Sequence, residues 1–136
     1  MQSGDPSAQR KLEPLCEKIG RQQVDEVIHA FYDKLRADAQ LAGFFTGISD
    51  FPPHEAHIAD FWWVAMGGKL DTPRQFDMLG LHRDMPLTEA AFERWLALFG
   101  ATLVEHLPAE QAAQWLSMAD GIGANLKRHT LSVHVE

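Results

Sequence analysis

The sequence predicts an all-α fold, and three observations lead to this prediction. Apolar residues recur at intervals of three and four through four long segments, which is the period of a helix that packs on one side. Most glycines and prolines fall between these segments, and no stretch has the alternation typical of a strand. The chain of 136 residues has the length of one compact domain, too short for a Rossmann-type enzyme or a barrel.

The first elements are a short helix and a longer one. A helix of one or two turns is expected to begin near Pro14, and the apolar residues expected to pack there are Leu12, Leu15 and Ile19. A longer helix is expected over about residues 21–36, and Tyr32 lies beside its apolar stripe. The stripe consists of Val24, Val27, Ile28, Phe31 and Leu35.

The next long helix follows two prolines, which are a start signal for a helix. His54 lies one turn before the first apolar position, on the same face. A pair of glycines at 67 and 68 ends the pattern. The apolar positions of this helix are Ile58, Phe61, Trp62 and Ala65.

Two further long helices are expected in the second half of the chain. Thr88 is the predicted N-cap of one, and Pro108 suits the first turn of the other. Gly121 and Gly123 weaken the middle of the last helix. The apolar positions are Phe92, Trp95, Leu96, Phe99 and Leu103 in the first of these helices, and Ala112, Trp115, Leu116, Ala119, Ile122 and Leu126 in the second.

The remaining segments are shorter or weaker. Between the second and third long helices, a two-turn helix is expected over about residues 73–82, and this connection carries His82. We expect a single domain over residues 1–136, with residues 1–10 and 130–136 as poorly ordered ends.

Charge and composition exclude several classes of partner. The chain has 12 Lys and Arg against 19 Asp and Glu, a net charge of −7, so we expect no binding to nucleic acid phosphates. No apolar run approaches the ~20 residues that span a bilayer, and no signal-like segment begins the chain, so we expect no membrane partner. The single cysteine, Cys16, forms no internal disulfide and suits a cytoplasmic protein.

Three polar side chains lie on or beside the apolar faces of three different helices. Tyr32, His54 and Trp95 carry a hydroxyl, an imidazole and an indole N–H, which need hydrogen-bond partners when they are buried. Taken alone, each aromatic residue is also typical of an ordinary core. Three such groups that point inward from separate helices indicate a cavity for a polar ligand.

Three stretches resemble a known family. They are FYDKLRADAQLAGFF at residues 31–45, HEAHIADFWW at residues 54–63 and LHRDMPLTEAAFERWLALF at residues 81–99. In the third stretch, Pro86 lies four residues after His82, and Trp95 lies thirteen residues after His82. In this order the stretches resemble the truncated branch of the globin family, and its third group most.

The resemblance implies a two-over-two helical sandwich that encloses haem b, with His82 as the axial ligand of the iron. It implies that Tyr32, His54 and Trp95 face the ligand on the opposite side of the iron. A neutral imidazole is a good ligand for haem iron, and an open opposite side admits a diatomic gas. The residues expected to contact the haem, besides His82, are Phe31, Phe45, Ile58, Phe61, Trp62, Met78, Met85, Phe92 and Trp95.

The expected function is reversible binding of dioxygen or another small diatomic ligand, with oxygen transport as one use. A reductase that keeps the iron ferrous is a further candidate partner. An alternative is a haem enzyme that acts on peroxide or nitric oxide, as a peroxidase or dioxygenase. A third alternative is a helical interaction module without haem.

The segment HEAH leaves one further question open. His54 and His57 are three residues apart, so either can turn toward the iron, which would make the resting iron six-coordinate. This spacing differs from the HExxH zinc motif, in which the histidines are four residues apart.

Overall fold

The computed structural model describes residues 13–72, 76 and 88–135, with 129–135 described by their backbone alone. Residues 1–10 and nearly all of the short helix expected over residues 73–82 therefore lie outside the described residues. So do Met78, His82 and Met85.

Within the described residues the fold is all-α, as predicted, with no strand assigned there. The four expected long helices and the short opening helix are present in the expected order. A 3₁₀ turn, η1, was not predicted. The elements are α2 (Leu15–Ile19), α3 (Arg21–Ala37), η1 (Ala42–Phe45), α4 (Phe51–Ala65), α6 (Glu89–His106) and α7 (Ala109–Val135).

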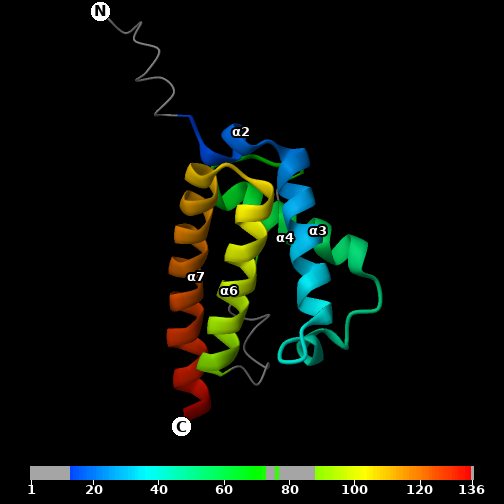
Figure 1. Cartoon of the computed structure of the whole chain (residues 1–136), viewed down its shortest axis with the longest axis vertical. Coiled ribbons are helices and arrows are strands. Elements are labelled where there is room, and N and C mark those ends of the chain that lie inside the picture. The colour runs from blue at the N-terminus through cyan, green and yellow to red at the C-terminus, as the bar shows by residue number, and fades with distance from the viewer. Residues whose placement is uncertain (1–12, 73–75, 77–87, 136) are drawn as a thin grey trace, which may run out of the picture.

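The long helices form two pairs, α3 with α4 and α6 with α7, and α3 also packs on α6. Figure 1 shows α6 and α7 side by side, in yellow and orange to red, with α3 beside them. The short α2 contacts both α3 and α7, and η1 contacts α3. This is the predicted two-over-two arrangement. No helix in the described ranges is both long and apolar enough to cross a bilayer.

Helix termini follow the signals in the sequence. The prolines of α4 fall in its first turn, where the missing N–H would have no helical acceptor. Thr88 caps α6, because its Oγ1 accepts a hydrogen bond from Ala91 N at 3.1 Å. Gly67, at φ 103°, ends α4 in a conformation that favours glycine, and a Cβ there would lie 2.9 Å from Pro14 Cβ.

The last helix is more regular than its glycines suggest. It begins at Ala109, directly after Pro108, and continues through Gly121 and Gly123 to Val135, so its backbone includes most of the end that was expected to be poorly ordered. Its packing on α6 and α2 outweighs the low helix propensity of glycine. Lys127 Nζ of α7 lies 3.6 Å from Oε1 of Glu89, the first residue of α6.

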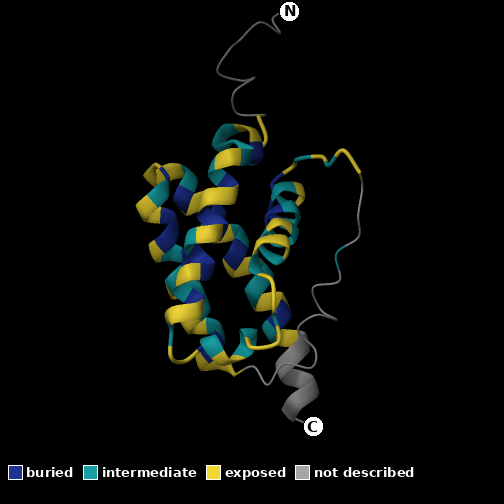
Figure 2. Ribbon diagram, turned by 90° about the vertical axis from the view of Figure 1, so that its right-hand side faces the viewer, coloured by how far each residue is buried: buried dark blue, intermediate teal, exposed yellow. Residues whose placement is uncertain are grey.

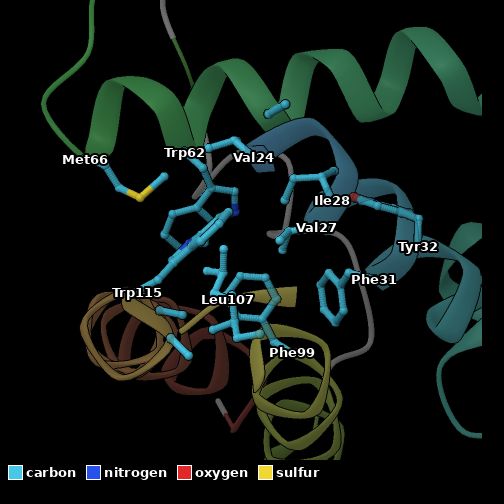
Figure 3. Close-up of a cluster of buried hydrophobic side chains, with 14 of the residues drawn as sticks. Val24, Val27, Ile28, Phe31, Tyr32, Trp62, Met66, Phe99, Leu107 and Trp115 are labelled. Carbon is cyan, nitrogen blue, oxygen red and sulfur yellow. The ribbon is translucent and has the colours of Figure 1, made fainter. Parts of the chain in front are cut away.

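The core is aromatic and centres on Phe99, which has no exposed surface. Its ring is stacked on Trp62 and Trp95 and meets Phe31 and Trp115 edge-on. Figure 3 shows Trp62, Phe99 and Trp115 converging from α4, α6 and α7, with Tyr32 at the other end of the cluster. Figure 2 shows that the buried positions lie along the sides of the helices that face one another.

Candidate functional site

A cavity of about 320 Å³ lies between α3, η1, α4, α6 and α7. Most of its lining is aromatic or aliphatic, which is typical of a site for a small molecule or cofactor. The side chains in the lining that can form hydrogen bonds are Tyr32, from α3, His54, from α4, and the indole of Trp95, from α6. The cavity therefore combines an apolar interior with hydrogen-bonding groups on one wall.

Nine of the residues predicted to face a haem or its ligand line this one cavity. They come from α3, η1, α4 and α6, so segments far apart in the sequence meet here. That they contact a haem stays a prediction. The nine residues are Phe31, Tyr32, Phe45, His54, Ile58, Phe61, Trp62, Phe92 and Trp95.

Tyr32 and His54 are joined by a hydrogen bond of 2.9 Å between Oη and Nε2. Their rings also meet edge-on, with centroids 5.2 Å apart. The bond can run in either direction, because a neutral imidazole carries one N–H and one acceptor nitrogen. When His54 Nε2 donates, the hydroxyl proton of Tyr32 is free to donate to a ligand in the cavity.

Burial keeps both groups neutral at pH 7. It raises the pKa of Tyr32 above 10.0, and the charge of Glu55 adds to this effect. Burial also lowers the pKa of His54 below 6.5, as does the charge of His57, while Glu55 opposes both. Tyr32 is therefore a phenol that keeps its proton, beside an imidazole that is uncharged.

Trp95 and Phe31 form the wall next to the core. Their rings meet edge-on at 5.7 Å, and Trp95 is stacked on Phe99 at 5.5 Å with an interplanar angle of 16°. Because Phe99 is fully buried, it fixes the plane of the indole. The orientation of Trp95 at the cavity therefore depends on the core behind it.

The two histidines of α4 lie in different surroundings. His54 lines the cavity, whereas His57 does not, and the His57 ring packs against Phe76 with centroids 5.1 Å apart. In this conformation His54, rather than His57, is the histidine within the cavity.

Several lining residues were not among the predicted site residues. Leu41 and Ile48 lie in the irregular connection between α3 and α4, where no periodicity indicates which side chains point inward. Ala91 is small, and Gly123 was interpreted only as a weak point of the helix. The other three lining residues are Phe44, Ile122 and Leu126. The sequence could have indicated them, because Phe44 is aromatic and the periodicity of the last helix points Ile122 and Leu126 inward.

An ion pair holds the corner that supplies part of this wall. Asp38 Oδ1 accepts hydrogen bonds from Arg94 at 2.8 Å (Nε) and 2.7 Å (Nη2), and the Asp38 side chain is 8% exposed. Asp38 Oδ2 accepts from the backbone N–H groups of Gln40 and Leu41, both at 3.1 Å. Asp38 thereby connects the end of α3 and the cavity-lining Leu41 to the residue that precedes Trp95 on α6.

The cavity suits an apolar ligand or cofactor that has a polar group on one side. Aromatic rings line it, and the hydrogen-bonding atoms of Tyr32 and His54 lie on a single wall. Because Cys16 is the single cysteine of the sequence, the chain offers no cysteine pair for covalent haem attachment. Cys16 is also fully buried and does not line the cavity. The predicted iron ligand, His82, lies outside the described residues.

Comparisons with known proteins agree with the fold. The family model for bacterial-like globins matches residues 14–125. A curated group 3 truncated hemoglobin of Campylobacter jejuni is 33% identical over 93 residues, which cover 64% of this chain and 72% of that protein.

Two solved structures have the same arrangement of helices. A group III truncated hemoglobin from Campylobacter jejuni has a TM-score of 0.74 and 27% identity, over 82% of this chain and 91% of that one. A 2/2 hemoglobin from Synechococcus, in the cyanomet state with covalently attached heme, has a TM-score of 0.71 and 26% identity, over 79% and 91%.

The predicted similarity to the third group of truncated haemoglobins is therefore confirmed. The family match covers most of the chain, and both structural neighbours are hemoglobins. The chain belongs to the bacterial-like globin family, whose members bind haem.

Proposed function

We propose that this protein binds haem b in the cavity and uses the iron to bind dioxygen or another diatomic gas reversibly. The observation that carries the proposal is the apolar cavity with the Tyr32–His54 hydrogen bond on one wall. Haem iron held by one histidine supplies an open coordination position for such a gas. His82 is the proposed iron ligand, and the apolar lining holds the porphyrin and excludes water.

Tyr32 stabilises a bound ligand that carries partial negative charge. Its phenol stays protonated, and His54 keeps Oη in place within the cavity. A hydrogen bond to a charged acceptor in a dry site contributes about 1.5–3 kcal/mol. Trp95 is the second proposed donor, and its stacking on Phe99 fixes the plane of its indole ring.

The experiment that tests haem binding is a titration of the full chain with hemin, followed by visible spectra of the oxidised, reduced and carbon monoxide forms. We expect one equivalent to bind and His82→Ala to weaken retention. A colourless protein that does not take up hemin would reject the proposed function. Unchanged spectra and retention in His82→Ala would reject that residue as the iron ligand.

Tyr32→Phe tests the proposed donor. The change removes only the hydroxyl, so we expect the dissociation rate of dioxygen to rise about tenfold or more while hemin stays bound. Stopped-flow measurement of oxygen release gives this rate. An unchanged rate would mean that Tyr32 does not donate to the ligand.

The neutral imidazole of His54 supports a second candidate function, the reduction of peroxide. A base within the cavity can accept a proton from peroxide, which is what a peroxidase requires. Steady-state turnover with hydrogen peroxide, compared between the native chain and His54→Leu, decides between the two functions. Negligible turnover in the native protein excludes the enzyme.

Cellular context completes the proposal. We place the protein in the cytoplasm, where the buried thiol of Cys16 stays reduced. A carrier needs ferrous iron, so a reductase is the proposed protein partner, and oxygen transport is the proposed role.

A further inference from the structure

Helix α7 turns one face toward the rest of the molecule, and Gly123 lies on that face. Ala112, Trp115 and Ala119, at spacings of three and four, are at most 3% exposed. Gly123 follows Ala119 after one helical turn, and Leu126 follows three residues later. Gly123 and Leu126 both line the cavity. The packed face of α7 thus continues into the cavity wall at this glycine.

Two common reasons for a glycine do not apply at position 123. Among the described glycines, only Gly20 and Gly67 have positive φ, so Gly123 has no backbone conformation that other residues avoid. At Gly100 of α6, a Cβ would lie 3.4 Å from Leu116 Cδ2, which indicates close approach of two helices. A Cβ at Gly123 would have no described atom within 4 Å.

Gly123 therefore lowers the stability of the helix, and no contact with a described residue accounts for a glycine there. Glycine inside a helix, relative to alanine, lowers the folding equilibrium constant about fivefold. The space beside its Cα belongs to the cavity, and any side chain on the inward face would occupy it. We infer that Gly123 is a specificity-determining residue, whose missing side chain keeps this part of the cavity open for a flat macrocyclic cofactor. This inference rests on the proposed haem binding.

Gly121 provides a matched control on the same helix. It lies two residues earlier and is exposed, and a Cβ at this position would also have no described atom within 4 Å. Unlike Gly123, it does not line the cavity. A substitution has the same effect on helix propensity at both positions, so any difference between them reports on the volume of the cavity.

The test uses Gly123→Ala and Gly123→Val, with Gly121→Ala and Gly121→Val as controls, all loaded with hemin. The rate of hemin loss to excess apomyoglobin is measured by visible absorbance, and far-UV circular dichroism reports helix content. We expect about tenfold faster loss from Gly123→Ala and a larger increase from Gly123→Val, because added volume displaces the cofactor. Both controls should stay within about twofold of the native chain, with unchanged helix content.

The outcomes separate this inference from the proposed function. Equal rates for the two alanine variants would overturn the role of Gly123 and leave haem binding intact. Failure of the native chain to bind hemin would overturn both. If Gly123→Val does not fold, the comparison of Gly123→Ala with Gly121→Ala still decides, since alanine favours the helix at either position.

Discussion

At the scale of single residues, the pair Tyr32 and His54 depends on pH through the imidazole. Burial holds the pKa of His54 below 6.5, so the unfolded chain takes up a proton at this site before the folded chain does. The contribution of neutral His54 to stability is therefore present above about pH 6.5 and is lost as the pH falls through its folded pKa.

His54→Gln tests this dependence, because glutamine is neutral at every pH. We expect the native chain to lose stability relative to His54→Gln between about pH 7.5 and pH 5, measured as the urea midpoint. A constant difference across this range would show that His54 does not titrate differently in the two states.

His29 gives a control of opposite sign. Its Nδ1 lies 2.9 Å from Glu55 Oε1, and this hydrogen bond raises its pKa above 6.5. Its contribution is therefore present below about pH 6.5 and disappears as the pH rises through the folded pKa. Since His29 is exposed, we expect His29→Gln to cost only ~0.5 kcal/mol, and only at low pH.

Single residues of the site were predictable in their position but not in their contacts. The types and spacing of Tyr32, His54 and Trp95 predicted a cavity for a polar ligand; all three line one cavity, and the ligand stays a prediction. The hydrogen bond between Tyr32 and His54 was not predicted, because it depends on the distance between α3 and α4. Periodicity places residues on a face but does not fix the distance between two helices.

At the scale of elements, the corner between α3 and α4 depends on Asp38. This residue binds Arg94 of α6 and accepts from two backbone N–H groups. No pattern in the sequence indicated this role, since an aspartate after a helix is typical of many turns. The long helices, in contrast, were predicted nearly to their ends, apart from the end of α7, because their packed faces repeat in the sequence.

Substitutions of Asp38 and Arg94 should lower the stability of the protein by different amounts. We expect Asp38→Ala to lower the urea midpoint more than Arg94→Ala, because it removes both the ion pair and the acceptor for the backbone. Arg94 is largely exposed, so its loss should cost less than ~1 kcal/mol. The exposed pair of Lys34 and Glu105 provides a control in Lys34→Ala, with a smaller effect. Equal effects of the Asp38 and Arg94 substitutions would contradict the backbone role.

At the scale of the whole molecule, Phe99 connects the core to the cavity. Its ring contacts Phe31, Trp62 and Trp95, which line the cavity, and Trp115, which does not. We expect Phe99→Ala to lower the free energy of unfolding by about 3–5 kcal/mol, a large share of the stability of a small domain. Urea denaturation measures this loss. Val104→Ala, at a side chain 69% exposed on the same helix, should change it by less than ~0.5 kcal/mol.

The fold class was predictable as a whole, because apolar periodicity and the three resembling stretches both extend over much of the chain. The cavity was predictable in its aromatic lining but not in its boundaries. Leu41 and Ile48 come from irregular backbone, and Gly123 contributes by lacking a side chain. Neither kind of contribution leaves a periodic pattern in a sequence.

The length of α7 has a practical consequence. Among the residues whose side chains are described, the last one of α7 to line the cavity is Leu126, and the helix backbone continues to Val135, about 13 Å further along its axis. A fluorophore or an immobilisation linker attached at this end would be separated from the cavity by rigid backbone. Such a conjugate would leave the pocket itself chemically untouched, and a fluorophore there would test the proposed gas binding optically.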